Sequence, residues 1–180
     1  QRQMASHLRS LGHERVVALT LPRDARRLPG WYAEEDELGI DVTRDRLAGF
    51  RDVFPEAPAY AAGASSIDDG LAAGRIVFAD PERRPTAVVA QSDLLAAGAI
   101  RAAEEAGLRV PADVSVTGFD GISVDGLAPY TLTTMVQPAA DKGRAAGEAV
   151  AAMIAGRDAA SIRFTCRFRE GNTAGPAPVA

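Results

Sequence analysis

A strand–helix–strand pattern over residues 86–118 constrains the fold more than any other feature of the sequence. "TAVVA" (86–90) is a short apolar run, "QSDLLAAGAIRAAEEAG" (91–107) has a helical pattern that ends at Gly107, and "VSVTG" (114–118) is a second apolar run. Two strands joined by a helix of this length lie parallel in one sheet. Strands that are apolar at nearly every position are typical of a sheet covered by helices on both faces.

Elements of the same two kinds continue on either side of this unit. Three further helices are predicted at 2–11, 66–79 and 138–155. A fourth begins after Thr43 as its cap and turns Leu47, Phe50, Val53 and Phe54 inward. The further predicted strands are 15–21, 58–62, 132–136 and 163–168. Residues 22–42 contain two prolines and two glycines, which predict a long exposed loop. We expect the Gly/Pro/Ala tail to be mobile. The alternation predicts an α/β fold with a doubly wound parallel sheet.

Charge and composition exclude several classes of protein. The net charge of −4 does not favour contact with a phosphate backbone, so this chain is not expected to bind nucleic acid directly. No apolar run is long enough to cross a membrane, and no membrane partner is expected. Cys166 is the only cysteine, which fits a reducing compartment and predicts a cytoplasmic protein.

No metal or cofactor is expected. His7 and His13 lie six residues apart without an acidic or cysteine partner at ligand spacing, and we interpret them as surface or helix-end residues. The sequence has no G-x-G-x-x-G after a strand, no P-loop and no nucleophile elbow. These absences argue against an enzyme.

Polar side chains follow two of the predicted strands directly. Ser92 and Asp93 come just after 86–90, and Asp120 comes two residues after 114–118. Arg46 lies in the predicted first turn of the helix after the long loop. Because ligands of open parallel sheets bind beyond the carboxyl ends of the strands, these side chains are candidates for one binding rim. There Asp120 would accept hydrogen bonds from two neighbouring groups, such as sugar hydroxyls.

Structural roles remain open for three of these residues. Asp120 precedes a glycine and can cap a turn. Ser92 or Asp93 can cap the helix that follows, because a helix N-cap favours a short oxygen-bearing side chain.

The cation and the loop aromatics also have two interpretations each. A cation in a first helical turn opposes the helix dipole, so Arg46 is expected either to bind a ligand or to form a buried ion pair. Trp31 and Tyr32 can stack on a ligand or merely cover the loop.

Four segments resemble LacI/GalR-type bacterial transcription regulators in order and spacing. They are "LGHERVVAL", "TRDRLAGF", "PTAVVAQSDLLAAGAIRAAEEAGLRVPADVSVTGFDGI" and "LAPYTLTTMVQP". The resemblance covers nearly the whole chain. It implies a periplasmic-binding-protein-like fold of two α/β subdomains joined by crossing strands, with an effector in the cleft between them and a dimeric core.

The resemblance also implies roles for single residues. Arg46 would hold the effector through its guanidinium, and Asp120 would take ligand hydroxyls or ring nitrogens. Ser92 stands where the family often has Asn. Ser65 stands where an aromatic residue often packs on the ligand, so Trp31 is the candidate to replace that contact.

The resemblance implies that parts of such a regulator lie outside this chain. Residues 1–132, with a leading helix at 1–12, and 160–180 would form the C-terminal effector-binding subdomain. Residues 133–157 would cross to a largely absent N-terminal subdomain, and the DNA-binding domain would be absent. The helix at 138–155 would then lack its usual partner sheet, and we expect its apolar face (Val150, Met153 and Ile154) to pack on something else, such as a second chain.

The leading hypothesis is therefore the effector-binding and dimerisation core of a LacI-type regulator. It would bind a small molecule, by default a sugar, and form a homodimer that meets DNA only through the missing helix-turn-helix domain. Three alternatives remain: a secreted solute-binding protein of the same fold, an α/β enzyme using Asp93 and Asp120 as acid and base, and a fragment that only dimerises. The dimerising faces would use the small residues Ala72, Ala73, Ala96, Ala99 and Ala103.

Overall fold

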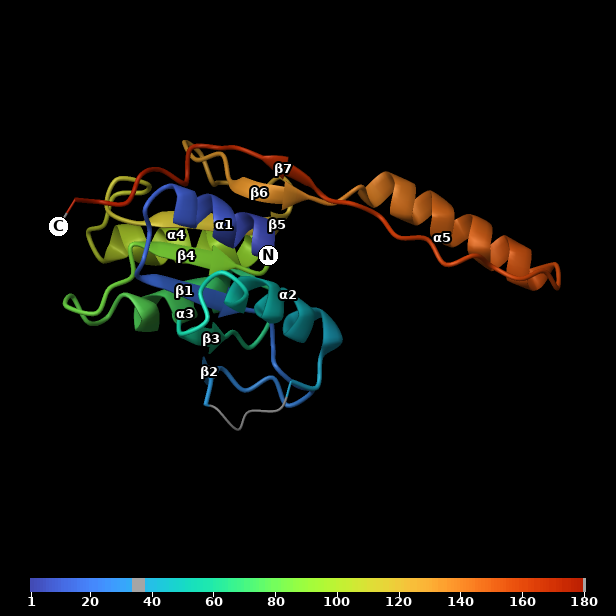
Figure 1. Ribbon diagram of the computed structural model, residues 1–180, viewed down its shortest axis with the longest axis horizontal. Helices are drawn as coiled ribbons and strands as arrows, with labels where there is room; N and C mark the ends of the chain where they lie inside the picture. The colour runs from blue at the N-terminus through green and yellow to red at the C-terminus, as the bar shows by residue number, and fades with distance from the viewer. Residues whose placement is uncertain (34–37, 180) are drawn as a thin grey trace.

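A seven-stranded sheet organises the chain in the computed structural model, which describes residues 1–33 and 38–179 (Figure 1). The strand order is β2-β3-β1-β4-β5-β6-β7. The strands are β1 (Val16–Thr20), β2 (Gly30–Trp31), β3 (Ala59–Ala61), β4 (Ala87–Ala90), β5 (Ser115–Asp120), β6 (Thr133–Val136) and β7 (Arg167–Arg169). The five inner strands are parallel, whereas β2 and β7 add antiparallel edges. The predicted doubly wound sheet is confirmed.

Helices cover both faces of this sheet. They are α1 (Arg2–Ser10) and α2 (Asp41–Arg51) on one face and α3 (Ile67–Val77) and α4 (Asp93–Glu105) on the other, while α5 (Ala139–Ile154) extends away from the sheet (Figure 1). Successive residues of β1 point to opposite cores: Val16 and Ala18 pack with α1 and α2, and Val17 and Leu19 pack with α3 and α4. Burial on both faces explains why the strand has no polar alternation.

Small residues bring α3 and α4 into close contact with each other. A Cβ on Gly70 or Gly98 would overlap backbone atoms of the facing helix, and one on Gly74 would overlap Ala102. Ala73, Ala96, Ala99 and Ala103 are buried in the same core, whereas Ala72 is exposed. The small residues that suggested a face for dimerisation therefore serve mainly to pack two helices within the chain.

The region before α2 differs from the sequence prediction. The loop contains the short edge strand β2, and α2 begins at Asp41 after Ile40 as N-cap. Thr43 is not the cap: it lies inside the helix, is buried, and its Oγ1 donates to the carbonyl oxygen of Pro22, 2.8 Å away. The hydroxyl thus fixes the start of the loop, and Asp41 supplies the acidic residue of the first turn.

The C-terminal tail packs against the sheet, so the expectation of a mobile tail is wrong for most of it. Thr173 is fully buried; its carbonyl accepts from the N–H of Val116 (2.7 Å) and its Oγ1 accepts from the N–H of Thr133 (3.0 Å). His13 is 1% exposed, which corrects the surface interpretation, because its ring bonds Thr86 Oγ1 and the carbonyl of Gly175. β7 is also shorter than the predicted strand.

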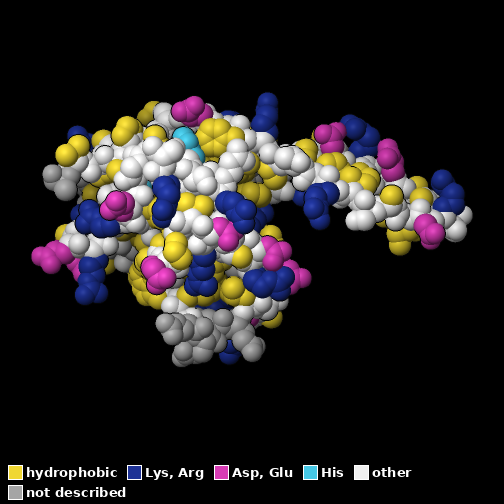
Figure 2. Space-filling view, in the orientation of Figure 1, with side chains coloured by type: hydrophobic (Ala, Val, Ile, Leu, Met, Phe, Trp, Pro, Cys, Tyr) yellow, Lys and Arg dark blue, Asp and Glu magenta, His cyan; other side chains and the backbone are white. Residues whose placement is uncertain are grey.

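No residue of α5 is buried, and the helix projects from the body of the molecule. Val150, Met153 and Ile154 are 55%, 64% and 83% exposed, and Figure 2 shows hydrophobic side chains along this projection. The apolar face predicted to lack a partner is therefore open in the structure. Within the described residues, none of the helices has the length and apolar character needed to cross a membrane.

Candidate ligand-binding site at the carboxyl edge of the sheet

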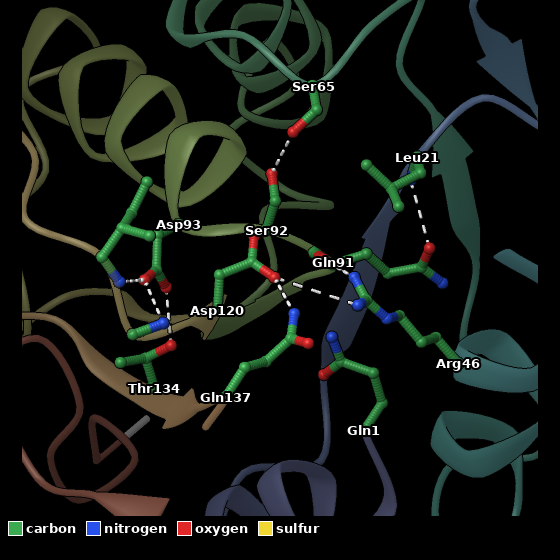
Figure 3. A network of polar contacts seen from close by, with 12 residues as sticks. Gln1, Leu21, Arg46, Ser65, Gln91, Ser92, Asp93, Asp120, Thr134 and Gln137 are labelled. Atoms are coloured by element: carbon green, nitrogen blue, oxygen red, sulfur yellow. Dashed lines mark hydrogen bonds and ion pairs between the residues drawn. The ribbon is translucent and has the colours of Figure 1, made fainter. Parts of the chain in front are cut away.

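A network of polar side chains lies at the carboxyl ends of β4, β5 and β6, facing the side of α2 (Figure 3). Of the residues proposed from sequence, the structure brings Arg46 and Asp120 into one ion pair and Ser65 and Ser92 into one hydrogen bond. We call this group, together with Gln137, the rim.

Arg46 is a half-buried cation that is held from three sides. Its Nη1 donates to the carbonyl oxygen of Gln91 (2.5 Å), its Cζ lies 3.9 Å from the ring centroid of Phe119, and its Nη2 is 3.9 Å from Asp120 Oδ1. Burial lowers the pKa of Arg46, and the negative charge of Asp120 opposes that shift. A guanidinium with so little freedom loses little entropy when it binds a ligand.

Arg46 lies in the second turn of α2 and not in the first, because the helix starts at Asp41. The helix-dipole argument for a partner is therefore weaker than the sequence suggested. Arg44, on the same helix, pairs with Asp41 and Asp45 on the helix surface.

Asp120 is the last residue of β5, which extends two residues beyond the predicted strand. Its φ of 121° is rare for a residue with a side chain, so the backbone there is strained. Its Oδ1 accepts from Gln137 Nε2 at 2.5 Å. Burial raises the pKa of Asp120, while the hydrogen bond from Gln137 and the charge of Arg46 lower it. The second carboxylate oxygen accepts no hydrogen bond from the described residues.

Asp93 holds the turn that places Asp120. It is fully buried at the start of α4, and its Oδ2 accepts from the N–H groups of Gly121 (2.7 Å) and Ile122 (2.8 Å). Its Oδ1 accepts from Thr134 Oγ1 at 2.6 Å. These three bonds direct the carboxylate inward and leave it unsuited to the acid or base role of the enzyme alternative.

Two glycines in "TGFDG" make this arrangement possible. A Cβ on Gly118 would overlap the Asp93 carboxylate, and one on Gly121 would overlap Val136. Gly121 also has a φ of 79°, which glycine adopts without strain. The glycines beside Asp120 therefore admit the buried carboxylate and turn the chain at the rim.

Ser92 combines a capping role with a place at the rim. Its Oγ accepts from the N–H of Leu95 at 3.2 Å, so Ser92 and not Asp93 is the N-cap of α4. The same oxygen accepts from Ser65 Oγ at 2.9 Å. Two small hydroxyl groups therefore meet at this point of the rim.

Trp31 does not lie near Arg46 and Asp120. It belongs to the edge strand β2, and β3, β1 and β4 separate it from β5. Its ring meets Tyr60 edge-on with centroids 5.2 Å apart, and no contact joins it to the rim. Tyr32 bonds Thr20 Oγ1 through its hydroxyl at 2.9 Å. The aromatics of the long loop cover the edge of the sheet in this structure.

Three residues of the network were missed in the sequence. Gln91 is 1% exposed and fastens α2 to β1: its Oε1 accepts from Leu21 N–H and its Nε2 donates to the Thr43 carbonyl, both at 3.2 Å. Phe119 supports Arg46, and Gln137 bonds Asp120. Both glutamines directly follow a strand, which is the signal that had identified Ser92 and Asp120.

Gln1 adds an acceptor near this network (Figure 3). Its Nε2 donates to the carbonyl of Ala90 at 3.1 Å, while its buried Oε1 has no hydrogen-bond partner among the described residues. Together the rim offers a guanidinium, a carboxylate oxygen, amides and hydroxyls, which suit a small ligand rich in hydroxyl groups. The described residues contain no cluster of three or more His, Cys, Asp or Glu that could hold a metal ion.

A cavity of about 460 Å³ lies away from the rim, where β1 begins. Its lining includes the apolar residues Val16, Phe54 and Pro58 and the charged residues Arg9, Arg15 and Glu56. None of the convergent, buried polar contacts of the rim occurs there, so we place the candidate site at the carboxyl edge.

The chain is similar in sequence to one domain family and to bacterial transcription regulators. Residues 5–170 match the periplasmic binding protein-like domain family. The chain is 32% identical over 165 residues to the HTH-type transcriptional regulator MalR of Streptomyces coelicolor, covering 88% of this chain and 44% of MalR. It is 36% identical over 110 residues to the ribose operon repressor of Halalkalibacterium halodurans, covering 58% of this chain and 32% of that repressor.

A solved structure agrees with these relatives. The Lac repressor dimer bound to operator and the anti-inducer ONPF superposes with a TM-score of 0.78 at 25% identity, over 97% of this chain and 57% of that chain. The chain thus spans less than half of the length of either regulator that it matches.

Proposed function

The chain belongs to the periplasmic-binding-protein-like domain family, as an effector-binding core of the LacI type and not an enzyme, and we propose that its rim binds a sugar or a similar polyhydroxyl effector. The observation that carries this proposal is the set of contacts around Asp120. The carboxylate of Asp120, on a strained backbone and with one free oxygen, lies beside the fixed guanidinium of Arg46, and buried hydrogen bonds hold both positions. Strain of this kind is typical of binding sites.

Each rim residue has a distinct role in this proposal. Arg46 donates two hydrogen bonds in one plane to ligand oxygens. Asp120 accepts from one ligand hydroxyl at its free oxygen and, in competition with Gln137, from a second hydroxyl at Oδ1. Ser92 and Ser65 offer hydroxyls to a second ligand oxygen. Asp93 and Gln91 position these groups without touching the ligand, and Trp31 lies outside the site.

The rest of the regulator would supply the response. The projecting segment with α5 would pack on a second subdomain, so that an effector bound between the two subdomains favours one relative orientation. Only such a difference in affinity between two states can shift DNA binding. The Lac repressor in the matching structure is a dimer on its operator. We infer a homodimer that contacts DNA through a separate domain, in the bacterial cytoplasm.

A thermal-shift screen of the chain against mono- and disaccharides tests this proposal. A sugar that binds at the rim raises the melting temperature of the wild type, and it has no effect on Arg46→Ala or Asp120→Ala. Arg144→Ala is the matched control, because Arg144 pairs only with Asp141 on α5. Sugars that shift all four proteins equally would place binding elsewhere. If no sugar shifts the wild type, the sugar proposal fails for this chain.

A further inference from the structure

One side-chain hydrogen bond joins α5 to the rest of the described chain. Lys142 Nζ, in the first turn of the helix, donates to Gln137 Oε1 at 2.7 Å. The other polar side-chain contact on this helix, between Arg144 and Asp141, stays within α5. No residue of α5 is buried, and its least exposed residues (Ala145, Ala149 and Ala152) are small, so packing constrains its orientation only weakly.

The amide nitrogen and the backbone of Gln137 bond Asp120 at the rim. Its Nε2 donates to Asp120 Oδ1 at 2.5 Å, and its backbone N–H donates to the carbonyl of Asp120 at 3.0 Å. Gln137 lies directly between the end of β6 and Pro138, the N-cap of α5. A continuous set of polar contacts therefore runs from Arg46 through Asp120 and Gln137 to Lys142.

We propose that Gln137 is a positioning residue that couples what Asp120 binds to the orientation of α5. An amide group can only serve both neighbours while its oxygen faces Lys142 and its nitrogen faces Asp120. A ligand hydroxyl that donates to Oδ1 competes with Gln137 for that oxygen and frees the amide to rotate, which also breaks the bond to Lys142. The inference deepens the proposed function, because it takes Asp120 as the ligand-binding carboxylate.

A distance measurement in the 180-residue chain tests the coupling without any ligand. One spin label is attached at Ala112→Cys, exposed in the loop before β5, and the other at Ala151→Cys, exposed on α5. Both substitutions are made in a Cys166→Ala chain, so that no other cysteine is labelled. Pulsed electron paramagnetic resonance then gives the distribution of distances between the two labels. We expect Gln137→Ala to broaden this distribution at least twofold. Lys142→Ala is expected to do the same, and since Lys142 is exposed this variant does not threaten the fold.

Two further variants decide where the coupling begins. Asp120→Ala removes the acceptor at the rim and is expected to broaden the distribution as much as Gln137→Ala does. Arg144→Ala removes a cation from the same helix without touching Gln137, and its distribution is expected to match the wild type. Distributions of wild-type width in Gln137→Ala and Lys142→Ala would overturn the inference.

Distance measurements with and without sugar distinguish failure of this inference from failure of the proposed function. If the variants broaden the distribution but no sugar binds, the coupling exists and the sugar proposal alone fails. If a sugar binds at Asp120 and the distribution is the same with and without it, the sugar proposal survives and the coupling to occupancy is wrong.

Discussion

Gly118 passes the carboxylate of Asp93 at a distance that leaves no room for a side chain. A Cβ on Gly118 would overlap Asp93 Oδ1 and approach Asp93 Cα to 3.3 Å. β5 and the start of α4 therefore meet through a carboxylate and a bare backbone. The position of Asp120, two residues further on, depends on that contact.

Gly118→Ala is expected to destabilise the chain by about 1–3 kcal/mol, because the added methyl group displaces a buried, hydrogen-bonded carboxylate. Urea denaturation measures this change. Gly143→Ala is the matched control: nothing lies within 4 Å of its added Cβ, so in an exposed helix it is expected to be neutral or to stabilise by up to about 1 kcal/mol. Equal stability of the two variants would contradict the described contact.

Asp93→Asn keeps the shape of the side chain and removes its charge. An amide offers one acceptor atom where the structure uses two, so a buried polar group loses its partner, at a cost of about 1–3 kcal/mol. Hydrogen exchange is expected to accelerate at the N–H groups of Gly121 and Ile122, which bond Asp93. Asp68→Asn, exposed in the first turn of α3, serves as the control. Unchanged exchange at both amides would show that Asp93 does not hold the turn.

Asp120→Gly and Asp120→Ala separate backbone strain from side-chain loss. Both remove the carboxylate, but only glycine tolerates a φ of 121°. Since strain of this type costs about 1–3 kcal/mol and glycine costs about 0.5–1 kcal/mol through the unfolded chain, Asp120→Gly is expected to be the more stable of the two. Thermal or urea denaturation measures the order. The reverse order would mean that the backbone at residue 120 is not strained.

His13 is expected to make stability depend on pH. Burial lowers its pKa below the ordinary value of 6.5, so the unfolded chain binds a proton that the folded chain resists. The contribution of neutral His13 to the free energy of unfolding is therefore complete above pH 6.5 and is lost as the pH falls through the lowered pKa. His13→Gln is expected to show a flatter profile of unfolding free energy between pH 7 and 5. Because Gly175 accepts from the ring, the loss is expected to appear first as faster exchange around residues 173–177. Parallel profiles for the two proteins would contradict this role.

Apolar patterning was sufficient to predict most of the fold. β1 and β4 are buried on both faces, so their runs are apolar at nearly every position, and β6 buries two threonines beside Met135. Ser66 and Ser92 cap their helices as short hydroxyl residues do. The start of α2 was missed because its N-cap, Ile40, makes no side-chain hydrogen bond to the helix. β2 was missed because two residues carry no periodicity.

Only part of the candidate site could be predicted from the sequence. Asp120 and Ser92 follow their strands, and topology alone brings such positions to one edge. Local sequence does not show which carboxylate oxygen is free. It therefore could not distinguish Asp120 from Asp93, whose three partners come from the turn after β5 and from β6. Trp31 was a candidate because it is an aromatic residue of the long loop and could replace the contact missing at Ser65. Its pairing with Tyr60 instead keeps it at the β2 edge of the sheet, away from Asp120.

The path of the C-terminal segment has a practical consequence. Its contacts with Leu11, His13 and Ser115 fasten it where the parallel strands begin, so the chain leaves the body there. An affinity handle or surface anchor joined to the C-terminal segment would therefore hold the molecule at the amino ends of its strands, with the rim turned toward the solution for direct binding assays.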